Sequence, residues 1–393
     1  MMMEERVEIE SAPRPSFEFY VTDHSANPAK DRSREELKEL YLDVKKDGIT
    51  SVRYDWNWRD VEAAPGKYNR GVLGHYQEAA EAMAEAGLSA PTIILSNPPA
   101  WAVELYKSDK EQFFLAYQRY VDQVKDCLLK LPTGEKISRI QILNELNNSI
   151  YTPIALEDIP RLCQITRETM SEYNPEIKLV GTVIADKLQT KVADRLGLGE
   201  GIEDFLVKLK TIAKYFDSIA VDYYPGVWRV PLKEIFGIDE DLKREMRDLD
   251  LLQKVFEEIA TWGKEYEVGE VGFPSNSPWR SERLQRYFYD VFFRTFRKMM
   301  MEMREKGLPL PSRIGLYQAV DNAPSSRTGK ILRKTPWPEH DFGLRDKSGR
   351  RKHILQKNLP RENQESDPSR LKWLIDYLNN LPDPISKPPA LEP

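Results

Sequence analysis

The segment ISRIQILNELN, residues 137–147, carries the pattern that decides the fold of this 393-residue chain. It begins with a short run rich in Ile that does not alternate strictly between apolar and polar residues. Such a run is typical of a strand in a parallel sheet that is covered on both faces. The polar residues Asn144 and Glu145 follow the run directly. The segment therefore predicts a buried parallel strand with candidate chemical groups at its carboxyl end.

Seven further runs of the same kind occur on either side of this segment. Their starts are separated by about 30 to 50 residues, which is the length of a β-α-β unit. The seven runs are 17–22 (FEFYVT), 49–54 (ITSVRY), 91–95 (PTIIL), 177–183 (IKLVGTV), 218–222 (SIAVD), 266–271 (YEVGEV) and 313–318 (RIGLYQ).

Helical patterns lie between the strands. The stretch 33–46 opens with a capping box at Ser33 and Glu36, and Gly48 ends it. The other expected helices are 76–85, 111–130, 159–173, 201–214, 249–266, 281–306 and 368–380. Eight strand–helix pairs in one series predict the α/β class and a single-domain (β/α)8 TIM barrel. Because periodicity does not separate short buried strands from buried helix segments, the alternative that some runs are helical stays open.

The expected barrel spans residues 17–381, with an N-terminal extension at 1–16 and a Pro-rich, disordered tail at 382–393. Two long loops interrupt the series, at 226–248 after strand six and at 322–367 after strand eight. Both follow the carboxyl ends of strands, where the active sites of barrel enzymes lie. The second loop is therefore a candidate cover for the mouth, or alternatively a mobile segment.

Composition excludes several classes of function. The net charge is −5, from 58 basic and 63 acidic residues, and no basic stripe indicates a nucleic-acid partner. No segment contains 18 consecutive apolar residues, so the sequence predicts no membrane span. The polar N-terminus lacks the apolar core of a secretion signal. Cys127 and Cys163 are too few for a disulfide framework or a zinc cluster. We therefore expect a cytoplasmic protein.

Polar residues gather at the expected strand ends. Glu145 follows strand four and Glu270 ends strand seven, while Arg53, Asp55, Asp222 and Gln318 end other strands. Two carboxyl groups flanking a bond are what glycoside hydrolysis requires. They stand about 5 to 5.5 Å apart in retaining enzymes and about 6.5 to 9.5 Å apart in inverting ones, a choice that the residues alone leave open.

Several segments together resemble the clan A glycoside hydrolases, the superfamily of cellulases, mannanases, galactanases and many β-glycosidases. The resemblance covers most of residues 17–380, and its segments follow the order and spacing of the family. They are 52–69 (VRYDWNWRDVEAAPGKYN), 97–101 (NPPAW), 142–147 (ILNELN), 220–226 (AVDYYPG), 269–275 (GEVGFPS), 316–321 (LYQAVD) and 341–352 (DFGLRDKSGRRK).

The resemblance implies a retaining hydrolase that acts on a carbohydrate without a metal or organic cofactor. It implies that Glu145 is the acid/base and that Glu270 is the nucleophile. Asn144 matches the Asn that binds the sugar 2-hydroxyl, and Arg53 matches the Arg that keeps the nucleophile ionised. The tyrosine that contacts the nucleophile is matched by Tyr224, or by Tyr223 if the alignment shifts by one residue.

Two positions depart from the family pattern. Gln318 stands where clan members usually have a Trp that forms a floor for the sugar, and Asn97 stands where a His is common. Both departures fall in the expected sugar subsite and suggest an unusual substrate.

Tryptophan residues just beyond the strands are further candidates, because aromatic faces stack on sugars. Each one fits core packing equally well, although we expect two or more in the cleft. The candidates are Trp56, Trp58, Trp101, Trp228 and Trp279.

Two other functions compete with a hydrolase. One is a carbohydrate-binding or regulatory barrel that has kept the fold without turnover, and the departures at Gln318 and Asn97 leave room for it. The other is a barrel enzyme of another class, such as a metal-dependent lyase or an aldolase. Neither the successive acidic strand ends of an enolase-type site nor a strand lysine for a Schiff base is evident.

Overall fold

The structure is a computed structural model that describes residues 17–24, 26–27, 32–89, 91–131, 137–149, 151–185, 201–224, 249–275, 281–321, 341–346, 348–356 and 369–381. The predictions for the N-terminal extension, the tail, the loop 226–248 and most of the loop 322–367 lie outside these residues.

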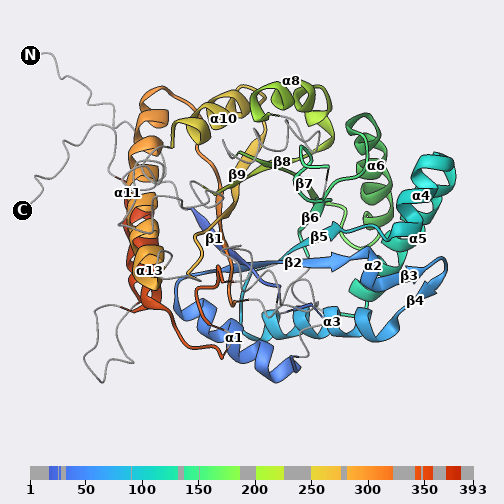
Figure 1. Ribbon diagram of the computed structural model, residues 1–393, viewed down its shortest axis with the longest axis horizontal. Coiled ribbons are helices and arrows are strands. Elements are labelled where there is room, and N and C mark those ends of the chain that lie inside the picture. Colours follow the sequence, from blue (N-terminus) through green and yellow to red (C-terminus); the bar gives the residue numbers. More distant parts are fainter. Residues whose placement is uncertain are drawn as a thin grey trace, which may run out of the picture.

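Eight parallel strands close into a barrel, which confirms the predicted (β/α)8 TIM barrel (Figure 1). Neighbouring strands follow the order of the chain around the barrel, and β10 pairs with β1 to close it. Each of the eight predicted runs is a strand, with ends that move by at most three residues. The barrel strands are β1 Glu18–Thr22, β2 Ser51–Asn57, β5 Thr92–Ser96, β6 Arg139–Ile142, β7 Lys178–Ile184, β8 Ser218–Tyr223, β9 Glu265–Val271 and β10 Arg313–Tyr317.

A ring of helices surrounds the barrel (Figure 1). The predicted capping box of α1 is present, since Ser33 Oγ accepts from the Glu36 amide at 3.2 Å and the Glu36 carboxylate accepts from the Ser33 amide at 2.8 Å. The α-helices are α1 Arg34–Lys46, α2 Trp58–Val61, α3 Arg70–Glu85, α4 Ala100–Ser108, α5 Lys110–Leu128, α6 Ile159–Met170, α8 Ile202–Ile212, α10 Asp250–Ala260, α11 Glu282–Glu305 and α13 Arg370–Asn379. Short 3₁₀ turns lie at η2 Leu156–Asp158, η3 Ala213–Tyr215 and η5 His353–Leu355.

Some helix ends differ from the prediction for local reasons. Helix α3 begins at Arg70 rather than at residue 76, because Asn69 Oδ1 accepts from the amides of Gly71 and Val72 at 3.1 and 3.2 Å. Helix α10 ends at Ala260 rather than at residue 266, and Gly263, with φ of 65°, turns the chain into β9. The hairpin of β3 Glu62–Ala64 and β4 Lys67–Tyr68 was not predicted.

The amino-terminal end of the barrel is filled by buried ion pairs. Glu267 lies 3.0 Å from Arg139 Nη2 and 3.6 Å from Arg313 Nη1, and all three side chains are almost fully buried. Charged side chains therefore occupy this end of the barrel interior.

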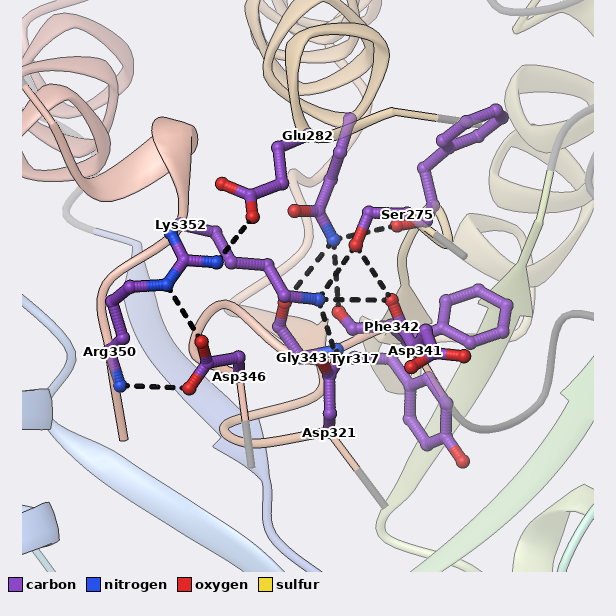
Figure 2. A network of polar contacts seen from close by, with 12 residues as sticks. Ser275, Glu282, Tyr317, Asp321, Asp341, Phe342, Gly343, Asp346, Arg350 and Lys352 are labelled. Carbon is purple, nitrogen blue, oxygen red and sulfur yellow. Dashed lines mark hydrogen bonds and ion pairs between the residues drawn. The ribbon is translucent and has the colours of Figure 1, made fainter. Parts of the chain in front are cut away.

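The described part of the loop after β10, residues 341–346 and 348–356, packs between α11 and the ends of β9 and β10 (Figure 2). Lys352 Nζ donates to Ser275 Oγ at 2.7 Å, to Asp321 Oδ1 at 2.6 Å and to the Asp341 carbonyl at 3.2 Å. These contacts tie three loops together beside the mouth. Among the described residues no helix has the length and apolar character that crossing a bilayer requires.

Candidate active site

The chain leaves β6 through an unusual backbone conformation that positions Glu145. Leu143 and Glu145 have φ of 59° and 47°, a region in which residues other than glycine are uncommon. The Leu143 amide donates to the Leu95 carbonyl at 3.0 Å, and the Leu146 amide donates to the Thr182 carbonyl at 2.7 Å. These bonds hold the turn against both neighbouring strands. Such local strain is often retained at functional sites.

The Glu145 carboxyl is buried, and its surroundings are polar. Asn148 Nδ2 donates to Glu145 Oε2 at 2.7 Å, and the Asn148 amide donates to the Glu145 carbonyl at 2.7 Å. The preceding Asn144 is held by Thr152 Oγ1, which donates to the Asn144 carbonyl at 2.6 Å. The Asn-Glu pair thus has a defined orientation at the mouth.

A β-bulge in β9 places Glu270. Val268 pairs with Val221 of β8, whereas the next pairing on this side joins Glu270 to Asp222, so that Gly269 is left without a register partner. The pairing with β10 shifts at the same point. Bulges redirect the side chains beside them and are common next to active sites.

Arg53, on β2, contacts both Glu270 and Asn144, the neighbour of Glu145. Its Nη1 donates to Glu270 Oε1 and, at 3.2 Å, to Thr22 Oγ1. Its Nη2 donates to Asn144 Oδ1 at 3.1 Å, and its Nε donates to Gln141 Oε1 at 2.8 Å. The guanidinium is almost fully buried, and nearby Glu270 keeps its pKa above the ordinary value although burial opposes this. Arg53 is therefore a fixed cation beside Glu270.

Tyr224 follows β8 and occupies the other oxygen of Glu270. Its hydroxyl donates to Glu270 Oε2. Burial, together with the charge of Glu270, raises the pKa of Tyr224 well above its ordinary value, so that the phenol stays neutral and donates. Glu270 is thus held by a cation on one oxygen and by a neutral donor on the other. Tyr223 is buried as well, but Tyr224 is the residue that contacts Glu270.

His24, Asp55 and Tyr317 form a polar and aromatic wall at the mouth, at the ends of β1, β2 and β10. His24 Nδ1 lies 2.6 Å from Asp55 Oδ2, and its Nε2 lies 3.1 Å from the Tyr317 hydroxyl. Burial lowers the pKa of His24, but Asp55 outweighs this effect and raises it above its ordinary value. The Tyr317 ring contacts Tyr224 edge to face at 5.7 Å between ring centres. The wall is therefore continuous with the Glu270 environment.

Tyr317 rather than Gln318 presents an aromatic side chain at the end of strand eight. The Gln318 side chain is fully buried, while its carbonyl accepts from the Leu344 amide at 2.8 Å. Tyr317 is half-buried and lies beside Phe342 (Figure 2). Sequence reasoning missed Tyr317 because it placed the strand end one residue too late.

The predicted tryptophan residues differ in their burial and in their contacts. Trp56 is fully buried and stacks on Tyr76, and Trp58 is buried and stacks on Tyr120. No sugar can stack on these faces, so the expectation that Trp56 and Trp58 form a platform is wrong. Trp101 is half-buried against the core, where its Nε1 donates to the Glu62 carbonyl at 3.1 Å.

Three predicted residues remain, Trp228, Trp279 and Asn97. Trp228 and Trp279 lie outside the described residues. Asn97 is half-buried after β5 with φ of 52°, and its Nδ2 donates to Asn57 Oδ1 at 2.6 Å. Within the described ranges, no group of three or more His, Cys, Asp or Glu side chains is arranged to hold a metal ion.

No family model and no curated protein matches this sequence. Solved structures, in contrast, match its fold. Beta-glycosidase BGL167 is 13% identical with a TM-score of 0.60 over 96% of this chain and 100% of that one. Exo-beta-1,4-mannosidase Op5Man5 from Opitutaceae bacterium strain TAV5 is 15% identical with a TM-score of 0.63, over 97% of this chain and 62% of that one, less than two thirds of its length. A GH5_18 structure from Streptomyces cattleya, in complex with GlcNAc, is 14% identical with a TM-score of 0.62 over 86% and 78%. The chain therefore has the (β/α)8 fold of these glycosidases.

Proposed function

We propose that this protein is a retaining β-glycoside hydrolase in which Glu270 is the nucleophile and Glu145 is the acid/base. The observation that carries the proposal is the environment of Glu270. Both of its oxygens accept hydrogen bonds, one from the buried cation Arg53 and one from Tyr224. Such partners favour an ionised, oriented carboxylate, which is the form that a nucleophile needs.

Glycosylation would begin with attack of a Glu270 oxygen on the anomeric carbon. Glu145 gives its proton to the oxygen of the leaving group, so that the glycosidic bond breaks as the ester to Glu270 forms. In the second step Glu145, now a carboxylate, takes a proton from water, and that water attacks the anomeric carbon. The ester breaks, Glu270 is restored, and the sugar leaves with its original anomeric configuration.

Asn144 is suited to bind the sugar 2-hydroxyl. Its Oδ1 accepts from Arg53 Nη2 and from Gln141 Nε2 at 3.1 and 3.0 Å. These two bonds identify Oδ1 as the acceptor end of the amide and fix the side chain, which directs the donor Nδ2 away from them. A hydrogen bond to the 2-hydroxyl strengthens in the transition state of this reaction.

The wall of His24, Asp55 and Tyr317 supports a sugar as the substrate. An aromatic ring provides an apolar face for sugar C–H groups, while a carboxylate and an imidazole supply partners for hydroxyl groups. A related fold is known in complex with GlcNAc, which also supports the carbohydrate class.

The test is a screen of aryl β-glycosides and of β-glucan, mannan, xylan and galactan, with the first product followed by proton NMR. We expect the β-anomer to appear first and then to mutarotate. Glu270→Gln and Glu145→Gln should abolish turnover of natural linkages, whereas Glu104→Gln, at an exposed site on α4, serves as the matched control. First release of the α-anomer would contradict retention. Sugar binding without turnover of any substrate would favour the non-catalytic barrel.

A further inference from the structure

The mechanism above does not use Asp222, whose carboxyl group is buried beside the proposed nucleophile, Glu270. It lies near the end of β8, is fully buried, and pairs in register with Glu270 across the β9 bulge. Its side chain fills the space left by the missing side chain of Gly269. A Cβ at residue 269 would overlap Asp222 Oδ1 and approach Ala220 Cβ at 3.0 Å.

Neither oxygen of the Asp222 carboxyl has a hydrogen-bond partner within the described part of the chain. The donors of the nearby Arg53 are directed elsewhere, to Gln141, Thr22, Glu270 and Asn144. An ionised carboxylate in a dry interior without a hydrogen bond is very costly, and such groups take up a proton instead.

Most of the charged groups around Asp222 favour its protonated form. Three carboxyl groups do so, those of Glu270 and Glu267 on β9 and that of Glu145 after β6, whereas the cation Arg53 on β2 opposes them. The hydroxyls of Tyr20 on β1 and Tyr224 after β8 also interact with it. Burial, followed by the charge of Glu270, raises the pKa of Asp222 well above its ordinary value although Arg53 opposes the shift.

We propose that Asp222 is an uncharged carboxylic acid in the working enzyme. Because a protonated Asp222 does not compete for Arg53, the positive charge of Arg53 then acts on Glu270 alone. Asp222 is then a positioning residue, because it acts on the reaction through Glu270. A negative charge on Asp222 would compete with Glu270 for Arg53 and would repel the carboxylate of Glu270. This role rests on the proposed function, whereas the protonation itself does not.

Infrared spectroscopy tests the protonation directly and without any substrate. Protein labelled with ¹³C at aspartate carboxyls should show, at pH 7, the C=O band of a protonated and desolvated carboxylic acid. The band should disappear in Asp222→Asn. It should persist in Asp55→Asn, the matched control, because Asp55 is ion-paired with His24. Absence of the band in the wild-type protein would overturn the proposal even if Asp222→Asn does not fold.

The pH profile tests the consequence for catalysis. Asn has the shape of a neutral Asp, so kcat/KM of Asp222→Asn should stay within about threefold of the wild type, with the same acid limb. If Asp222 is ionised in the native enzyme, its removal should lower the acid limb by about one pH unit or more, which contradicts the proposal. A band present in a protein that hydrolyses no glycoside would leave Asp222 neutral while refuting the proposed function, so the two failures are distinguishable.

Discussion

At the scale of single residues, the site depends on two unlike donors to one carboxylate. Arg53 supplies a positive charge to Glu270 and is itself fixed by three other acceptors. Tyr224 supplies a neutral hydroxyl. The cation attracts the negative charge of Glu270, whereas the phenol contributes through one directed hydrogen bond.

Tyr224→Phe and Tyr223→Phe form a matched pair that tests this division. Both rings are buried to the same extent, and they are adjacent in the chain. Loss of a hydrogen bond to a charged group costs about 1.5 to 3 kcal/mol, so kcat/KM of Tyr224→Phe should fall by roughly 10- to 150-fold. Tyr223→Phe should change it much less. A larger loss in Tyr223→Phe would show that the contact to Glu270 is assigned to the wrong tyrosine.

At the scale of elements, the β9 bulge determines where Glu270 points. Gly269 is the extra residue of the bulge, and the Asp222 carboxyl lies against its Cα. Gly315 on β10 allows an equally close approach, because a Cβ there would overlap the Gly269 carbonyl. Because Gly269 and Gly315 have no side chains, β9 can approach its two neighbouring strands closely next to Glu270, the proposed nucleophile.

Gly269→Ala should move β8 and β9 apart. Overpacking of this kind costs about 1 to 3 kcal/mol of the free energy of unfolding. A displacement of about 1 Å at a reacting group costs on the order of 100-fold in rate, so we expect kcat/KM to fall by about that factor. Gly74→Ala in α3, where an added Cβ meets no atom within 4 Å, is the control and should keep full activity. Wild-type activity in Gly269→Ala would mean that the bulge does not position Glu270.

The elements also show what a sequence can predict and what it cannot. Strands were found because burial on both faces leaves a continuous apolar signature, and α1 was found because its capping box is local. The positive φ angles of Leu143 and Glu145 leave no such signature, because tertiary contacts impose them. Trp56 and Tyr317 lie close to strand ends, and only the register of the strand decides which ring enters the core and which reaches the mouth.

At the scale of the whole molecule, the segment 341–356 joins the loops at the mouth to the outer helices. Arg345 is fully buried and pairs with Asp47 at the end of α1, and Arg350 Nη2 donates to Glu282 of α11 at 2.6 Å (Figure 2). Lys352, in the same segment, forms an ion pair with Asp321, which follows β10. The segment is thus tied to α1 and α11 by ionic contacts, of which those of Arg345 and Lys352 are buried.

Asp321 makes part of this stability dependent on pH. Burial raises the pKa of Asp321 from 3.8 to about 6, although Lys352 opposes the shift. Folding therefore favours the protonated form of Asp321. The contribution of this group to the free energy of unfolding is present below its pKa in the unfolded chain and is lost as pH rises through about 6. The rise in pKa corresponds to about 3 kcal/mol of that free energy.

Urea unfolding of the wild type and of Asp321→Asn across this range is the measurement. Because Asn does not titrate, the wild type should lose about 3 kcal/mol relative to the variant between about pH 3 and about pH 7. A difference that stays constant, or that favours the wild type as pH rises, would contradict a raised pKa of Asp321 in the folded protein.

The central claim is the division of roles between Glu270 and Glu145, and azide rescue tests it most directly. In Glu270→Ala no glycosyl ester can form, so azide in the vacated space should attack the anomeric carbon and give the α-glycosyl azide. In Glu145→Ala an activated aryl glycoside still forms the ester, and azide should then accelerate its breakdown and give the β-glycosyl azide. Opposite configurations from the two variants are the predicted result. The same configuration from both, or full activity in either without azide, would contradict the assignment.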